Sequence, residues 1–314
     1  MPFGKKYFIT NLKWILFLWT YLCNRSLATS TCQNSDGNNA ADWAILYKAP
    51  AQPNGKILHA GAVGGNWADS PAAVTQNNGH SFAKAIEHVF APHGENKFIA
   101  YNNDPPDVPK VRTKSNSKGV LMMDTGNTDA AAWIVHTVPG FPKARTGYLF
   151  PPAEVQKGHL LICLTIKEDQ IDTIGKSMTL RIATPLIYYN DIPDAQMNSR
   201  PNLRKLVSGE SRLTPPLAVT QDTTTAAAQS LKVTIYSKGE KSRYVTSPIT
   251  VNGHASSLES DVSQWLISEP GNKFCVIDKP YHKSQTKEPA MAVCIDDATI
   301  FGHFNRIGQN VENC

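Results

Sequence analysis

Residues 114–124, which read KSNSKGVLMMD, join a polar and basic segment to the apolar run 119–123, and Asp124 closes the run. Such a run is typical of a β-strand, and polar side chains at the entrance of a strand often carry the chemistry of a site. The pattern therefore predicts a strand that presents Asn116 and Lys118 at the edge of a sheet.

The next apolar block, residues 131–142 (AAWIVHTVPGFP), predicts an antiparallel neighbour over residues 133–138. His136 lies inside this predicted strand, between apolar residues. A buried histidine in that setting is more often a core residue than a catalyst, but its nearness to Lys118 keeps both interpretations open.

Further strands are predicted where β-forming residues cluster, over residues 42–50, 97–101, 159–166 and 231–236. Helices are predicted over residues 82–90, 169–176 and 300–307. Residues 214–230 are rich in Thr, Ala and Pro, and they predict a loop or a poor helix. Strands mixed with helices throughout indicate an α/β or mixed α+β class.

Residues 1–28 differ in composition from the rest of the chain. Three lysines precede an apolar run at residues 14–23, and the segment 26–28 supplies small residues suited to signal peptidase. This pattern predicts a cleaved secretion signal. The alternative is a membrane anchor, but the run is much shorter than the roughly 20 residues that a spanning helix needs. We therefore expect a secreted protein, with a lysosomal location as the alternative, and no membrane attachment after cleavage.

The predicted signal also accounts for most of the positive charge. Residues 1–28 hold four basic residues and no acidic ones, so their removal lowers the formal net charge from +5 to +1. A chain this close to neutral is not a strong nonspecific binder of polyanions. Lys110, Arg112, Lys114 and Lys118 form a local basic cluster, which suits either a phosphate-facing patch or a solvated loop.

Five cysteines remain once Cys23 leaves with the signal. An odd number in an oxidising compartment leaves one thiol over. The His and Cys residues match no zinc-binding spacing, so we expect no structural metal.

Several ordered segments resemble the deoxyribonuclease II family: residues 42–43 with 47–48, 101–106, 118–124, 133–142, 161–163 and 261–265. The resemblance implies a phospholipase D-like fold with two sheet-and-helix halves in one domain, residues 29–314. The halves are expected at about 29–200 and 201–314, with the second one shortened. The resemblance also implies the disulfides Cys32–Cys163 and Cys275–Cys294, which leave Cys314 free or able to link two chains.

The activity that the resemblance implies is hydrolysis of DNA at acid pH without metal or cofactor, leaving 3′-phosphates. In the family, each half brings one His-x-Lys motif to a shared cleft. One imidazole attacks the phosphorus, the other protonates the leaving oxygen, and the two lysines neutralise charge on the phosphate.

This sequence departs from that pattern at three of the four positions. Asn116 replaces the first histidine, whereas Lys118 matches the first lysine. In the second motif, Val262 replaces the histidine and Gln264 replaces the lysine. The vestigial catalytic set is therefore Asn116, Lys118, Val262 and Gln264. Supporting candidates are Asp124, His136 and Ser263, and the candidates for phosphate binding are Arg112, Lys114 and Lys118.

These observations support three hypotheses about function. The first is a secreted, catalytically impaired pseudoenzyme that binds a protein partner or nucleic acid, with weak and salt-dependent affinity for DNA. The second is an active acid endonuclease, in which His136, His254 or His282 takes over the lost roles. The third is a secreted protein-binding module that does not use the cleft. In each case we expect a monomer, or a dimer linked through Cys314.

Overall fold

The computed structural model describes residues 30–91, 94–109, 115–126, 129–179, 186–210, 219–239, 249–251, 254–256, 261–268, 271–278 and 289–308. The predicted signal lies outside the described residues, and so do Lys110, Arg112, Lys114, His282 and Cys314. Within the described ranges, none of the helices has the length and apolar character that crossing a membrane requires.

The larger of two main sheets has eight strands, and every neighbouring pair is antiparallel. In spatial order the strands are β10 (Ile187–Asn190), β6 (Asn96–Tyr101), β7 (Gly119–Asp124), β8 (Ala131–His136), β9 (His159–Ile166), β3 (Trp43–Lys48), β4 (Asn54–His59) and β5 (Ala68–Ala73). The central strands β7, β8 and β9 are buried along their whole length. Both faces of the sheet are covered, which explains why their sequences are continuously apolar instead of alternating.

The smaller sheet has five strands and is also antiparallel throughout. Its spatial order is β11 (Val219–Thr224), β12 (Lys232–Gly239), β17 (Pro289–Asp296), β16 (Lys273–Ile277) and β15 (Trp265–Ile267). Two short pairs complete the strands: β1 (Cys32–Gln33) with β2 (Ala40–Ala41), and β13 (Ile249–Val251) with β14 (His254–Ser256).

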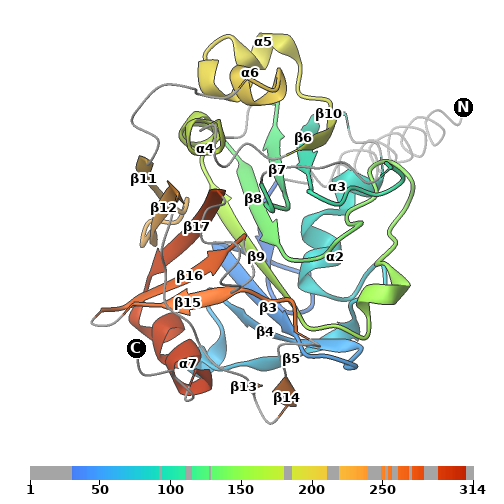
Figure 1. Cartoon of the computed structure of the whole chain (residues 1–314), viewed down its shortest axis with the longest axis vertical. Helices are drawn as coiled ribbons and strands as arrows, with labels where there is room; N and C mark the ends of the chain where they lie inside the picture. Colours follow the sequence, from blue (N-terminus) through green and yellow to red (C-terminus); the bar gives the residue numbers. More distant parts are fainter. Residues whose placement is uncertain are drawn as a thin grey trace, which may run out of the picture.

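Helices cover the outer parts of both sheets, as Figure 1 shows. One face of the large sheet packs against α2 (Ser81–Ala85) and α3 (Glu87–Phe90), and the smaller sheet lies on its other side. The remaining helices are α4 (Ile171–Met178), α5 (Asp194–Met197), α6 (Pro201–Val207) and α7 (Ala298–Ile307), with short 3-10 turns at η1 (Val63–Gly65), η2 (Pro152–Glu154) and η3 (Glu168–Gln170). The predicted mixed α+β class is confirmed.

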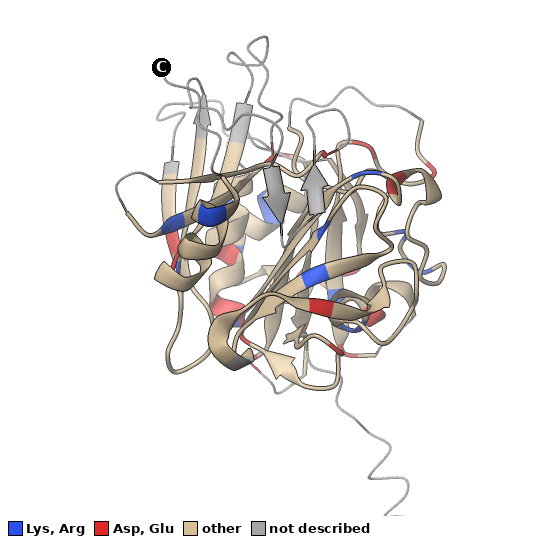
Figure 2. Ribbon diagram, turned by 90° about the horizontal axis from the view of Figure 1, so that it is seen from below, with Lys and Arg blue, Asp and Glu red and all other residues tan. Residues whose placement is uncertain are grey.

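Figure 2 marks the positions of basic and acidic residues along the ribbon, and both kinds occur in the described chain. Several of them form ion pairs, among them Lys84–Glu87, Arg200–Glu168 and Lys273–Asp296. Mixed signs at short spacing largely cancel at long range.

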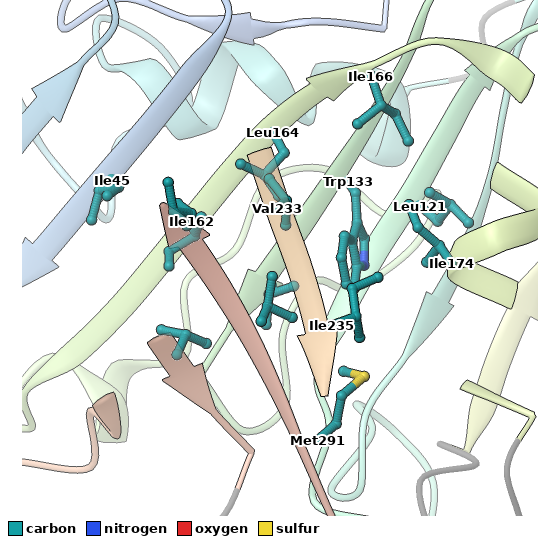
Figure 3. Packing of buried hydrophobic residues seen from close by; sticks show 14 of the residues in the cluster. Ile45, Leu121, Trp133, Ile162, Leu164, Ile166, Ile174, Val233, Ile235 and Met291 are labelled. Atoms are coloured by element: carbon teal, nitrogen blue, oxygen red, sulfur yellow. The ribbon is translucent and has the colours of Figure 1, made fainter. Parts of the chain in front are cut away.

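A single apolar core joins the two sheets. Trp133 and Leu164 of the large sheet pack in the same buried cluster as Val233, Ile235 and Met291 of the smaller one (Figure 3). All five side chains are at most 1% exposed. Burial of large apolar side chains on this scale contributes roughly 1.5–3 kcal/mol per residue to folding, so the interface between the sheets is a major source of stability.

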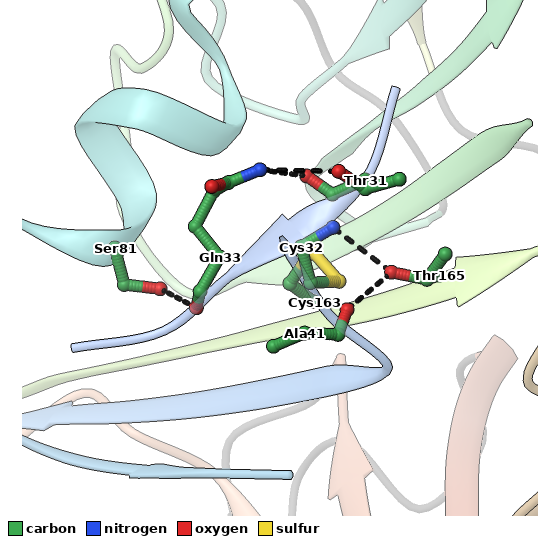
Figure 4. Close-up of a disulfide and its surroundings, with 7 residues drawn as sticks. All are labelled: Thr31, Cys32, Gln33, Ala41, Ser81, Cys163 and Thr165. Carbon is green, nitrogen blue, oxygen red and sulfur yellow. Dashed lines mark hydrogen bonds between the residues drawn. A yellow bond between two sulfur atoms is a disulfide. The ribbon is translucent and has the colours of Figure 1, made fainter. Parts of the chain in front are cut away.

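Two disulfides confirm the predicted pairings. Cys32 pairs with Cys163 in the middle of the large sheet, and Cys275 pairs with Cys294 across neighbouring strands β16 and β17. Beside the first disulfide, the Thr165 hydroxyl accepts a hydrogen bond from the Cys32 N–H at 2.9 Å and donates one to the Ala41 carbonyl at 2.7 Å (Figure 4). The N-terminal segment is thus attached to the sheet by covalent and polar contacts.

One prediction of local structure was confirmed in part, and another was wrong for part of its range. The predicted helix over residues 82–90 is two short helices, because Ile86 has φ −107° and ψ 18°, outside the α-helical region. Within the predicted loop or poor helix at residues 214–230, residues 219–224 form the strand β11, whereas residues 225–230 form neither helix nor strand. The threonines of β11 are β-branched and therefore suit a strand, although their hydroxyls give the segment the polarity of a loop.

Candidate functional site

Antiparallel order brings several polar residues to one end of the large sheet. Lys118 directly precedes β7, His136 ends β8, His159 begins β9 and Lys48 ends β3. The His136 N–H donates to the Lys118 carbonyl at 3.1 Å, and Lys48 is the register partner of His159. We use the name Lys118 site for Lys118, His136, Glu154, His159 and Asp278, which are coupled electrostatically in this region.

Lys118 is a partly exposed cation with acidic neighbours. Its ammonium donates a hydrogen bond to the Asn116 carbonyl at 3.2 Å. Burial lowers the pKa of Lys118 to about 8, although the carboxylates of Asp278, Asp104 and Glu154 act in the opposite direction. The charge that would meet a phosphate is therefore already partly balanced within the protein.

Asn116 lies at the entrance to β7, as the sequence predicted. Its side-chain oxygen accepts a 3.4 Å hydrogen bond from the Asn103 amide, and the residue is partly exposed. An amide is neither a useful nucleophile nor a proton donor for hydrolysis at ordinary pH. Asn116 can therefore form hydrogen bonds at this position, but it cannot act as a nucleophile or as a general acid.

His136 lies beside Lys118 but is 4% exposed and contacts the ring of Phe141. The Val138 N–H donates to Nδ1 at 3.2 Å, which assigns the proton of the neutral ring to Nε2. That Nε2 has no hydrogen-bond partner among the described residues. Burial, with further contributions from the charges of Lys118 and His159, holds the pKa of His136 well below its ordinary value. The environment of the ring therefore favours its neutral form.

His159 is completely buried and has polar contacts within the fold. Its Nε2 lies 3.1 Å from Glu154 Oε2, and its Nδ1 lies 3.3 Å from the Thr137 hydroxyl. Burial lowers the pKa of His159, and the hydrogen bond to Glu154 opposes that effect without cancelling it. Lys48 is also fully buried, and it donates to the carbonyls of Ala49, Val155 and Lys157. These contacts give His159 and Lys48 structural roles.

The period of two along a strand places these side chains on the face that carries helices. His136 is two residues from Ile134 and His159 is two residues from Leu161, both of which pack in the cluster with α2 and α3. His159 also contacts the ring of Phe150, a member of that cluster. The two imidazoles consequently belong to the core beneath the sheet end.

The second motif comes against the same sheet end. Asp261 forms a bridge with Gly158, and the Val262 N–H donates to the Gly158 carbonyl at 3.1 Å. The Tyr47 hydroxyl donates to Asp261 Oδ2 at 2.6 Å, and the Ser263 N–H donates to Asp261 Oδ1 at 2.8 Å. Residues from opposite ends of the chain are thereby brought together beside His159.

The changed residues of this motif supply little chemistry. Val262 has no polar side-chain atom, and the main chain of Gln264 accepts the Ile277 N–H at 2.9 Å. The hydroxyl of Ser263 is buried without a hydrogen-bond partner among the residues that the structure describes. Neither Val262 nor Gln264 provides a proton donor or a cation at neutral or acid pH.

Asp278 is a member of the site that the sequence interpretation missed. Its Oδ2 accepts the Ser117 hydroxyl at 2.7 Å, and its Oδ1 accepts the Met291 N–H at 2.8 Å. Asp278 directly follows β16, whose register with β17 pairs Cys275 with Cys294. The cysteine spacing was a partial signal, because a disulfide between neighbouring strands indicates their register.

Other predicted site residues lie elsewhere. Asp124 is at the opposite end of β7 from Lys118, six residues along the strand and hence about 20 Å away. Its carboxylate accepts the Gly126 N–H at 3.0 Å. Among the residues that the structure describes, no group of three His, Cys, Asp or Glu side chains is arranged to hold a metal ion.

Comparison with known proteins agrees with this architecture. The sequence model described as Deoxyribonuclease II matches residues 31–248. The chain is 27% identical to Plancitoxin-1 of Acanthaster planci over 212 residues, which cover 63% of this chain and 57% of that protein. It is 25% identical to Deoxyribonuclease-2-alpha of Mus musculus (58% and 53% covered) and 26% identical to Deoxyribonuclease-2-beta of Homo sapiens (53% and 48% covered).

The chain therefore belongs to the deoxyribonuclease II family. Its phospholipase D-like fold follows from that membership and from the two sheets described above. The matches span about half the length of these curated relatives. The family match includes Asn116, Lys118 and His136 and ends before Val262, so the assignment of the second motif rests on the local resemblance at residues 261–265.

Proposed function

We propose that this chain is a catalytically impaired deoxyribonuclease II-like protein whose Lys118 site holds a phosphodiester group without cleaving it. The observation that carries the proposal is the composition of the site. Lys118 is present, but Asn116, Val262 and Gln264 stand where the family resemblance places two histidines and a second lysine. Val262 is nevertheless held at the same sheet end by its bond to Gly158.

The loss of both imidazoles removes the chemical steps themselves. Hydrolysis through a covalent intermediate needs a nucleophile for phosphorus and an acid for the leaving oxygen. An amide and a valine supply neither of these groups. Removing a catalytic unit of this kind typically lowers kcat on the order of 10⁶-fold, so cleavage by this chain should be close to background.

The neighbouring histidines are poor replacements. His136 is 4% exposed and His159 is fully buried, so neither ring is positioned for in-line attack on a bound phosphate. Burial also lowers the pKa of each ring, which disfavours the protonated form that a general acid needs at pH 5. An active acid endonuclease remains the alternative function, and one local observation that favours it is the Nε2 of His136, which has no hydrogen-bond partner among the described residues.

Binding is supported by the cation that remains. Lys118 lies at the sheet end where a phosphate would approach, and the expected charge of the chain without residues 1–28 is only +1. Affinity for nucleic acid should therefore be weak and should fall with salt. The two disulfides favour an oxidising compartment, which supports the proposed secreted or lysosomal location.

A plasmid assay tests the proposal directly. Supercoiled DNA is incubated with the purified protein between pH 4.5 and 7.5, with and without EDTA, beside an active family member as a positive control. We expect no nicking above background, together with retention of labelled DNA at low salt. Nicking at acid pH that survives EDTA would establish the active enzyme instead, and absence of retention even at low salt would favour a protein-binding module.

A further inference from the structure

We propose that Lys48 is a positioning residue of the Lys118 site, because its buried ammonium holds residues 155–157 and the next residue, Gly158, receives the second motif. The inference deepens the proposed function, on which it rests for the assignment of this sheet end as the place where a phosphate binds. Lys48 ends β3 and lies outside the His-x-Lys pattern.

The Lys48 ammonium is enclosed by main-chain carbonyls. The residue is 0% exposed, and its three N–H groups match three acceptors: the carbonyl of Ala49 at 3.1 Å, that of Lys157 at 2.8 Å and that of Val155. A buried ammonium is costly unless hydrogen bonds of this kind replace those to water. Burial lowers the pKa of Lys48 to about 8, so the charged form still prevails at acid pH.

The turn after β3 contacts the same segment. The Ala51 N–H donates to the Gln156 carbonyl at 3.2 Å, so residues 48–51 together bind the carbonyls of three consecutive residues, 155–157. Ala51 has φ 58°, in the left-handed region that alanine rarely adopts. Such a conformation persists where the surrounding contacts over-determine the backbone. The turn and the segment 155–157 therefore form one fixed unit.

Gly158 connects this unit to the second motif. It forms the bridge with Asp261, and its carbonyl accepts the Val262 N–H at 3.1 Å. A Cβ at position 158 would lie 2.5 Å from Asp261 Oδ1 and 3.1 Å from Asp261 Cα, so this close approach requires a glycine. Tyr47 donates to the same Asp261 carboxylate. Two consecutive residues of β3 thus hold the second motif, Tyr47 directly and Lys48 through residues 155–158.

Loss of the Lys48 ammonium should loosen the second motif while the large sheet stays intact. Three main-chain carbonyls would lose a donor, and the loss of a hydrogen bond in a buried setting is unfavourable. The strands β7, β8 and β9 pair through their own ladders, which do not include the carbonyls of residues 155–157. The effect should therefore be confined to residues 155–158 and 261–265.

Three variants test this inference. Lys48→Met removes the ammonium and keeps an unbranched side chain. Lys56→Met is the matched control, because it makes the same change in net charge on the neighbouring strand β4, where Lys56 pairs with Asp69. Gly158→Ala crowds Asp261 without changing Lys48. Circular dichroism and thermal unfolding establish that each variant is folded, and Lys48→Gln, whose amide keeps two N–H donors, replaces Lys48→Met if the latter does not fold.

Hydrogen exchange of main-chain amides at pH 6 is the first measurement. We expect residues 261–265 to exchange on the order of tenfold faster in Lys48→Met and in Gly158→Ala, as for the loss of a typical hydrogen bond. Exchange in β7 and β8 should match that of the unchanged chain, which a general loss of structure would not allow. Lys56→Met should change neither region.

Gln264→Lys supplies the second measurement, because it restores the cation that the family resemblance places in the second motif. Binding of a labelled single-stranded oligonucleotide is followed by fluorescence anisotropy at several salt concentrations. Gln264→Lys should steepen the slope of log K against log salt by about 0.7, the value for one further phosphate contact on a single strand. Added to Lys48→Met, the same change should leave the slope of Lys48→Met nearly unaltered.

The outcomes separate the inference from the proposed function. Unchanged exchange at residues 261–265 in folded Lys48→Met or Gly158→Ala overturns the inference, and so does an equal effect of Gln264→Lys with and without the Lys48 ammonium. Faster exchange at residues 261–265, with no DNA bound by any variant even at low salt, supports the positioning role of Lys48 and overturns phosphate binding at this sheet end.

Discussion

The Tyr47 hydroxyl donates a 2.6 Å hydrogen bond to the carboxylate of Asp261, a residue 214 positions later in the chain. Together with the Gly158–Asp261 bridge, this bond holds the second motif against the large sheet. Val262 and Gln264 thus differ from the histidine and lysine that the family resemblance implies, but the segment that contains them lies at the same sheet end as Lys118. The proposed loss of catalysis is therefore attributed to substitution of these residues and not to displacement of the segment.

Restoring one histidine should not restore cleavage. Asn116→His returns a candidate nucleophile beside Lys118, but Val262 and Gln264 still provide neither an acid nor a second cation. In the plasmid assay at acid pH we expect this variant to match the unchanged chain. The triple variant with Val262→His and Gln264→Lys is the informative comparison. Nicking by Asn116→His alone would show that a resident group, such as His136, already serves as the acid.

Stability should fall as the pH drops below about 6.5. His136 and His159 have pKa values below the ordinary value of 6.5 in the folded state, so the unfolded chain takes up protons first as the solution is acidified. Their contribution is fully present above pH 6.5 and is lost as pH falls toward the folded pKa values. Urea unfolding at pH 7.5, 6.0 and 5.0 measures this trend.

The variant His136→Asn supplies the control for that trend. An amide oxygen can replace Nδ1 as the acceptor for the Val138 N–H, but it does not titrate. We expect the variant to lose less stability on acidification than the unchanged chain. An equal or steeper loss would mean that other groups dominate the acid sensitivity.

Gly119→Ala should be strongly destabilising. A Cβ at this position, the first of β7, would overlap the Ile134 carbonyl oxygen and the Tyr101 hydroxyl. Tyr101 is fully buried and accepts the indole N–H of Trp133 at 2.8 Å, so it has little freedom to move. Overpacking of this kind typically costs about 1–3 kcal/mol in the free energy of unfolding. Gly94→Ala is the matched control, because no atom lies within 4 Å of its added Cβ; equal effects of the two changes would contradict the argument.

The two disulfides should differ in their contributions to stability. Cys32–Cys163 spans 131 residues, whereas Cys275–Cys294 spans 19. Restricting a longer loop removes more entropy from the unfolded chain, so losing the first disulfide should cost about 4–5 kcal/mol and losing the second about 3 kcal/mol. Paired Cys→Ser variants in guanidinium unfolding test this order, and a larger loss for the shorter loop would reverse it.

Elements with a clear apolar pattern could be predicted from the sequence. Strands buried on both faces are continuously apolar, and a helix buried on one face repeats its apolar residues with the helical period. The strands β7, β8 and β9 and the final helix α7 appear close to the expected positions. The strand β11 was missed because it lies at the edge of its sheet and consists mostly of polar residues. Local polarity indicates a loop unless the partner strand is known.

The site was predictable in part for a related reason. Asn116 and Lys118 are local to one strand entrance, and resemblance located Val262 and Gln264. Glu154 and Asp278 join them only through tertiary contacts, with His159 and Ser117 respectively. The division into halves near residue 200, the signal at residues 1–28 and the role of Cys314 stay predictions.

The apolar core between the sheets determines whether fragments of this protein can be studied separately. Trp133 and Leu164 on one sheet, and Val233 and Ile235 on the other, are solvent-free only while both sheets are present. A fragment ending near residue 200 would expose the apolar face of the large sheet that the smaller sheet covers. Such a fragment should aggregate when it is expressed by itself. Point substitutions in the intact chain are therefore the sound route to assigning roles to either sheet.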